Sequence, residues 1–373
     1  MGLKDVQTQI VTQPFSEAGA AAGAAAAIIS GTFLHVIDVT SVPPTEVSEP
    51  ALTFAAGGDG EALHVFPPLH YAFVLSGPTN PTPDRLQIFD LSNRAAPVTV
   101  CASAVVGSTE AGQYTMAVKS TGLIFIALRV AAFVSMPDTL EFFDISTPAV
   151  PASIAVYNLK TGFAVNQGFP ETIVLQSDSV AVVTAKGDPI VGALLGFYDI
   201  TNPLAMTQTA VTNVEVVADA VFNLLDVQGN FAYTLFRSVI LGVKELRIYD
   251  ISAPAAPILA GSVALPGNMI NGSQLDNGKI YGCAVIADNN LYVFDVSNPV
   301  APALVATLLV AVNSNFSIRG RNNRAYLASQ LAGATNFVVS SFDTSIAAAP
   351  VLIGTSAVYQ VAGGRSNLQL DIL

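Results

Sequence analysis

Seven aspartates recur at a nearly regular interval along this 373-residue chain, and a carboxylate can serve as a general acid, a general base or a metal ligand. They are Asp38, Asp90, Asp144, Asp199, Asp250, Asp295 and Asp343. Each ends a short apolar phrase and is followed two positions later by Ser or Thr, as in Leu246-Arg-Ile-Tyr-Asp250-Ile-Ser. An aspartate in this position begins a tight turn by accepting hydrogen bonds from the backbone N–H groups that follow. We therefore predict that the seven aspartates are structural turn residues.

A second set of acidic residues lies between the phrases, in segments with almost no Lys or Arg. These residues are Asp59, Glu61, Glu110, Glu171, Glu215 and Asp219. An acidic rim of this kind can concentrate cations or a basic partner surface, and it can equally serve only to keep an apolar protein in solution. Both interpretations stay open, and the first makes these residues candidates for holding a divalent cation.

The remaining chemistry-bearing residues form no recognisable catalytic set. The three histidines are His35, His64 and His70, and no Cys or acidic pair joins them at the spacing that zinc requires. Cys101 and Cys283 lie in apolar segments and are expected to be buried free thiols. Nucleophile-elbow, metalloprotease, P-loop and dinucleotide motifs are absent from the sequence. We therefore predict no catalytic residues, no cofactor-binding residues, no cofactor and no dedicated metal site.

The aspartate phrases define a repeat with intervals of 52, 54, 55, 51, 45 and 48 residues. A period near 50 with strand-like content predicts four-stranded β-propeller blades. In the fifth period, Ala220–Val227 and Asn230–Phe236 are two strands separated by the turn Gln228-Gly229. We call the strands of each blade A, B, C and D from the axis outward, with the aspartate phrase in strand C. In up-and-down order the A–B and C–D turns share one face, and the acidic set belongs to the D–A loops of the other.

The two ends of the chain predict how the ring closes. The first period lacks a clear strand A, whereas the tail Ser366–Leu373 alternates apolar and polar residues as a strand does. We therefore predict an all-β, seven-bladed propeller of four-stranded antiparallel blades, in which the C-terminal strand completes the first blade. Such closure removes two exposed sheet edges.

The phrase, its spacing and the Ser/Thr-x-Pro turns, such as Thr147-Pro148 and Asn298-Pro299, resemble the LVIVD-repeat family. That resemblance implies a seven-bladed β-propeller over residues 24–373 and says little about activity, because the repeated residues are structural. Residues 1–23 fall outside the blades and are predicted to form an N-terminal arm. The seventh copy has Ser341 in an apolar position and no Pro within five residues of Asp343, which predicts a distorted turn there.

Composition narrows the possible partners. The net charge of −12 disfavours binding to the phosphate backbone of nucleic acids, which requires a basic surface. Charged residues form 11% of the chain and hydrophobic residues 51%, yet no run of about 20 apolar residues predicts a transmembrane segment. The N-terminus does not resemble a secretory signal peptide. The compartment is therefore open, although the low charge favours a cell-surface or virion location over a cytoplasmic one.

Two functions from different classes follow. The first is a non-enzymatic protein-interaction scaffold, or structural component of a cell-surface or virion-type assembly, because depletion of charged residues is typical of protein–protein interfaces. Its expected partners are other protein subunits. The alternative is a small-ligand or cation-binding protein, or an enzyme, that acts at the acidic loop face and holds a divalent cation at the mouth of the propeller channel.

Overall fold

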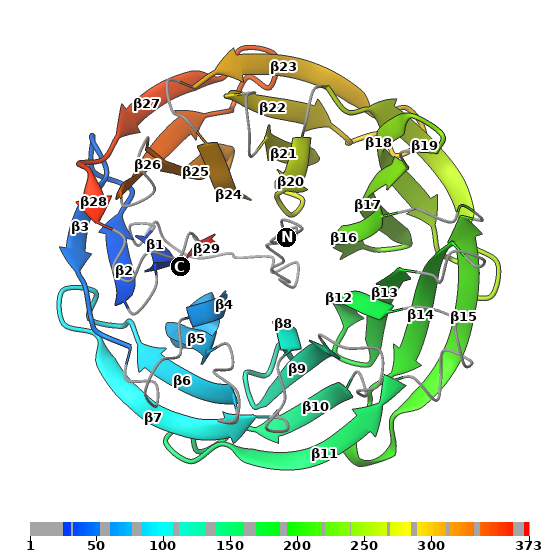
Figure 1. Cartoon of the computed structure of the whole chain (residues 1–373), viewed down its shortest axis with the longest axis horizontal. Helices are drawn as coiled ribbons and strands as arrows, with labels where there is room; N and C mark the ends of the chain where they lie inside the picture. Colours follow the sequence, from blue (N-terminus) through cyan, green and yellow to red (C-terminus); the bar gives the residue numbers. More distant parts are fainter. Residues whose placement is uncertain are drawn as a thin grey trace.

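Seven antiparallel sheets are arranged in a ring around a central axis (Figure 1). The computed structural model describes residues 25–30, 33–52, 60–76, 84–106, 112–131, 139–159, 169–186, 192–215, 217, 221–238, 240–266, 269–284, 289–310, 314–331, 336–360 and 369–372. The predicted all-β, seven-bladed propeller is therefore confirmed. The predicted N-terminal arm, residues 1–23, lies outside the described residues. Within them, no helix has both the length and the apolar character needed to cross a membrane.

In blades 2 and 3 the chain runs from strand A to strand D, whereas blade 1 takes its strand A from residues 369–372. Blade 1 contains β29 (Gln369–Ile372), β1 (Ala25–Ser30), β2 (Phe33–Asp38) and β3 (Thr45–Ser48). Blade 2 contains β4 (Gly60–Phe66), β5 (Tyr71–Ser76), β6 (Asp84–Asp90) and β7 (Val98–Val106), with the 3-10 turn η1 (Pro67–Leu69) between its first two strands. Blade 3 contains β8 (Gly112–Val118), β9 (Ile124–Ala131), β10 (Thr139–Asp144) and β11 (Ala152–Asn158).

The remaining blades repeat this order. Blade 4 contains β12 (Phe169–Ser177), β13 (Val180–Lys186), β14 (Ala193–Asp199) and β15 (Thr207–Glu215), with η3 (Pro203–Ala205) before the last. Blade 5 contains β16 (Val221–Gln228), β17 (Phe231–Ser238), β18 (Val243–Asp250) and β19 (Ile258–Ala264). Blade 6 contains β20 (Met269–Gly272), β21 (Lys279–Ala284), β22 (Asn290–Asp295) and β23 (Ala303–Leu309). Blade 7 contains β24 (Ser314–Arg321), β25 (Arg324–Gln330), β26 (Asn336–Asp343) and β27 (Val351–Thr355), and β28 (Tyr359–Gln360) also pairs with β26.

The ring closes as the sequence predicts. Strand β29 pairs antiparallel with β1, with Leu370 opposite Ile28 and Ile372 opposite Ala26. Leu370 is fully buried between blade 1 and blade 7, where its backbone N–H donates to Ser317 Oγ at 3.2 Å. Residues from the two ends of the described chain therefore form one sheet.

The carboxylate of Asp371 connects this closing strand to both neighbouring blades. Its Oδ2 accepts the backbone N–H of Val65 in blade 2 at 2.7 Å and lies 3.7 Å from Nδ1 of His64. Its Oδ1 lies 3.7 Å from Nε of Arg319 in blade 7. Burial lowers the pKa of His64 to about 3, and the nearby Arg319 charge lowers it in the same direction. The imidazole is therefore neutral at pH 7, and the charged pair beside it is Asp371 with Arg319.

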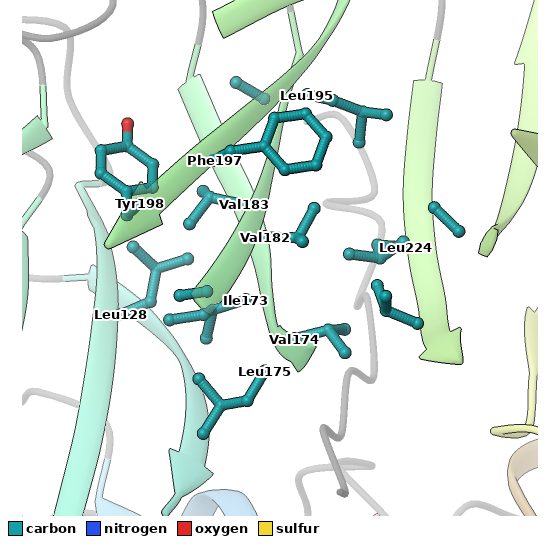
Figure 2. Packing of buried hydrophobic residues seen from close by; sticks show 14 of the residues in the cluster. Leu128, Ile173, Val174, Leu175, Val182, Val183, Leu195, Phe197, Tyr198 and Leu224 are labelled. Atoms are coloured by element: carbon teal, nitrogen blue, oxygen red, sulfur yellow. The ribbon is translucent and has the colours of Figure 1, made fainter. Parts of the chain in front are cut away.

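Apolar side chains fill the spaces between adjacent blades because both faces of every sheet are covered by a neighbour. In blade 4, Ile173 and Val183 face Leu128 of blade 3, whereas Val174 and Phe197 face Leu224 of blade 5 (Figure 2). This two-sided burial accommodates the large hydrophobic fraction of the chain.

Every pairing between strands C and D contains a register shift just before the turn aspartate. In blade 1 it falls between Val36 and Ile37, and the other six blades have it at the equivalent residues. A bulge of this kind adds one residue to strand D, twists it, and makes its free edge a poor template for another strand.

Candidate functional site

Each of the seven turn aspartates ends a strand C and accepts the backbone N–H of the residue two positions later. The donors are Thr40, Ser92, Ser146, Thr201, Ser252, Ser297 and Ser345, at 2.8–3.0 Å. The hydrogen bonds from Ser146 lower the pKa of Asp144, and those from Ser252 lower the pKa of Asp250. The aspartates lie in seven different blades, so the structure does not bring them together into one acidic site.

The predicted distortion of the seventh turn is wrong. Ser345 donates its N–H to Asp343 at 2.8 Å, and the Ala349 N–H reaches the Ile346 carbonyl at 3.0 Å, as in the turns of blades 2–6. The geometry depends on the aspartate and the backbone, so the missing proline does not disturb it. The turn that differs is the first, which is one residue shorter and contains a cis Val42–Pro43 bond.

The acidic loop residues are only partly within the described structure. Glu61 lies in β4, Glu171 in β12 and Glu215 in β15, each near a strand end on the loop side of its blade. The other three, Asp59, Glu110 and Asp219, lie outside the described residues, as do the side-chain positions of the first three. A cation site at the channel mouth therefore stays a prediction.

The three histidines occupy different environments. His64 is buried in β4, whereas His70 lies in the turn after η1 with a left-handed φ of 55°, so the two are not on facing strands. Cys101 and Cys283 are buried and free, as expected. His35 is buried in β2 and contacts two carboxylates that the sequence analysis did not single out: its Nδ1 lies 2.6 Å from Oε1 of Glu46 and 3.6 Å from Oε1 of Glu49.

Strand alternation hides the relation between Glu46 and Glu49, because residues three apart in a regular strand point to opposite faces. The bulge in β3 changes this. Glu46 is opposite Ile37, and Ser48 is opposite Val36, so the next residue, Glu49, comes opposite His35. Since residues 35 and 37 share a face of β2, both glutamates lie on that face. The sequence contains one signal of this relation. The first aspartate phrase contains a histidine, His35, and the outer segment that follows it contains two acidic residues, Glu46 and Glu49.

The outer rim, which we define as the seven C–D turns and the seven D strands, has an unusual surface for a solvent-facing edge. Five of the seven D strands, β7, β11, β19, β23 and β27, contain no charged residue. Large apolar side chains are nevertheless exposed along turns and strands in several blades, among them Val150, Leu204, Ile258, Val300, Leu309 and Ile346. These five D strands are therefore both apolar and uncharged, and the charges of the outer rim lie mainly on the aspartates of its turns.

Neighbouring blades hold the outer rim in place by contacts from one D strand to the next C–D turn. Ser48 of blade 1 donates to the Arg94 carbonyl of blade 2 at 2.6 Å, and Thr212 of blade 4 donates to the Pro254 carbonyl of blade 5 at 3.1 Å. Between blades 5 and 6, Gly261 lies so close to the next turn that a Cβ atom would be 2.5 Å from the Pro299 carbonyl oxygen. The apolar surface is therefore attached to a fixed framework.

Comparison with known proteins supports the class of fold. The model of the LVIVD repeat matches residues 224–264 and 281–310, which lie in blades 5 and 6. Together with the seven-bladed ring, this match confirms the resemblance inferred from the phrases: the chain is a β-propeller that carries LVIVD repeats. No curated protein matches the chain in sequence.

Solved structures resemble the ring at low sequence identity. A prolyl endopeptidase matches with 12% identity and a TM-score of 0.56 over 91% of this chain and 50% of its own, so this chain spans half the length of that enzyme. Hydrazine synthase of Kuenenia stuttgartiensis matches with 12% identity and a TM-score of 0.55 over 89% of this chain and 90% of its own. At this identity the similarity concerns the fold alone.

Proposed function

We propose that this protein is a non-enzymatic interaction scaffold, a component of a larger assembly that binds other protein subunits through its outer rim. The observation that carries the proposal is the absence of charged residues from five D strands that also expose large apolar side chains. A free propeller gains from Lys or Glu on such edges, which keep molecules apart. Depletion of charge is instead typical of surfaces that a partner covers.

The energetics agree with this proposal. Leu309 is 75% exposed and Leu204 71%. Fully covering a side chain of this size stabilises a complex by about 1.5–3 kcal/mol. Several such residues on adjacent blades can therefore supply a substantial affinity. Because each D strand is bulged, we expect the partner to pack against side chains rather than to add a strand to the sheet.

The test replaces exposed apolar residues of the outer rim on three successive blades. The triple variant Ile258→Lys, Leu309→Lys, Val351→Lys changes only exposed positions and is expected to fold as the wild type does. Sedimentation of the full chain isolated from its native source should show a complex larger than one 38.6 kDa chain for the wild type, and a single chain for the variant.

A matched control is Ile240→Lys, which is 69% exposed but lies between β17 and β18, away from the outer rim. It should sediment with the wild type. The proposal fails if the wild type is strictly monomeric and carries no partner, or if the triple variant assembles as well as the control does. Placement of such an assembly on a cell surface or a virion stays a prediction from composition.

A further inference from the structure

We propose that His35, Glu46 and Glu49 form a binding site for one divalent first-row transition-metal ion of the Zn²⁺ type. Within the described ranges, this is the one group of at least three His, Cys, Asp or Glu residues whose ligand atoms all lie within 4.8 Å of one another. One imidazole and two carboxylates are a donor set suited to zinc and its first-row neighbours. Glu46 belongs to β3, a D strand of the outer rim, but the site does not depend on the interaction proposed there.

The distances require little adjustment. Ligand atoms bound to a tetrahedral zinc ion at its usual bond lengths lie roughly 3.3 Å apart. The distance of 3.6 Å from His35 Nδ1 to Glu49 Oε1 is already close to this value. The distance of 2.6 Å from His35 Nδ1 to Glu46 Oε1 must open slightly. The Glu46 side chain is one-quarter exposed and therefore has room for that movement.

The charges at the site are unbalanced without a cation. Two carboxylates flank one imidazole, so the group is net negative even when His35 is protonated. Aromatic residues of blade 7 cover it: the His35 ring lies 5.0 Å from the Phe337 ring and 6.1 Å from the Tyr359 ring, centroid to centroid. Such apolar cover weakens solvent screening, which strengthens both the repulsion between the carboxylates and their attraction to a cation.

The repeat itself shows that the fold does not need this set of residues. The residue equivalent to His35, three before the turn aspartate, is Glu141 in blade 3, Arg247 in blade 5 and Tyr292 in blade 6. The two positions equivalent to Glu46 and Glu49 hold Ser153 and Val156 in blade 3, Leu259 and Ser262 in blade 5, and Leu304 and Thr307 in blade 6. Blades with these residues keep the same strand pairing. The His-Glu-Glu combination is therefore a feature added to blade 1.

The location suggests what the ion does. All three ligands belong to β2 and to the segment that begins with β3, and β3 pairs with β2 through only three residue pairs. A bound ion would hold this short outer strand of the blade in which the ring closes. Water would complete the coordination, as at other sites with three protein ligands.

The experiment uses the full chain freed of metal with a chelator, with Zn²⁺ alone as the probe. Calorimetric titration and elemental analysis should find one Zn²⁺ per chain, and excess Zn²⁺ should raise the melting temperature by about 3 °C at a hundredfold excess over Kd. Glu49→Gln keeps the size of a partly exposed side chain and removes one ligand charge, so its Kd for Zn²⁺ should rise roughly 100-fold.

Glu46→Gln should behave in the same way. The matched control Glu245→Gln alters a carboxylate with the same exposure as Glu46, in β18 of blade 5, and should bind Zn²⁺ like the wild type. The proposal is overturned if the wild type binds no stoichiometric Zn²⁺, or if Glu49→Gln binds it as tightly as Glu245→Gln.

Discussion

Replacing Asp371 by alanine should destabilise the ring more than replacing any of the turn aspartates. The substitution removes the acceptor for the Val65 N–H and leaves the guanidinium of Arg319, which is 4% exposed, without its carboxylate. Removing one partner of a buried ion pair costs about 3–5 kcal/mol, because the remaining charge stays buried. Net stabilities of folded domains are about 5–15 kcal/mol, so the loss is a large fraction of the total.

The assay is equilibrium unfolding in urea followed by far-UV circular dichroism, since the chain has no tryptophan. Asp343→Ala is the control, because it removes a comparable N–H acceptor at an exposed turn in blade 7 and should cost about 1 kcal/mol. Asp371→Asn, which keeps a hydrogen-bond acceptor but loses the charge, should fall between the two. If Asp371→Ala is no less stable than Asp343→Ala, then the buried carboxylate does not hold the closing strand to its neighbours.

Three further predictions concern pH, the outer rim and the core. The pKa of His64 is lowered to about 3 in the fold, so only the unfolded chain gains a proton at this residue as the pH falls from about 6.5 to 3. The free energy of unfolding of the wild type, relative to that of His64→Gln, should therefore fall by up to about 1.4 kcal/mol per pH unit across that window. A difference between the two proteins that does not change with pH would contradict this. Gly261→Ala should cost about 1–3 kcal/mol in urea unfolding, because its Cβ meets the Pro299 carbonyl, whereas Ala264→Ser at an exposed position of the same strand should cost little. Phe197→Ala should lower the free energy of unfolding by about 3–5 kcal/mol by leaving a cavity between blades 4 and 5, and an unchanged urea midpoint would argue against tight packing there.

The features that could be predicted from the sequence are those with a local physical cause. An aspartate after an apolar strand caps the backbone two residues later whichever blade it is in, so seven turns follow from seven phrases. The closing strand could be predicted because blade 1 lacked a strand and the tail alternated. The burial of Asp371 in this strand could not be predicted from alternation, because both faces of a strand A are covered and a polar residue there is buried as well.

The features that were missed depend on contacts between distant residues. The sixth period has a strand-like segment at Ile270–Leu275, but β20 ends at Gly272. The N–H of Leu275 is bonded to Asp226 of blade 5, and the hydroxyl of Ser273 accepts the N–H of Tyr281, so this backbone leaves the regular ladder. Likewise, the seventh period has a strand-like segment at Val351–Tyr359, but Ser356 exchanges hydrogen bonds with Val339 and separates β27 from β28. The glutamates beside His35 were missed because a bulge reverses the facing that simple alternation gives.

Because β29 completes blade 1, the first blade to leave the ribosome is the last to be finished. The β1–β2 pair has to wait for residues 369–372 to be synthesised before its inner edge is satisfied. During that interval Ile28 and its neighbours present an open edge to the machinery that handles nascent chains. Circular permutation that moves residues 369–372 in front of β1 would let every blade form in order of synthesis, and it should raise the yield of folded protein during expression without altering the finished ring.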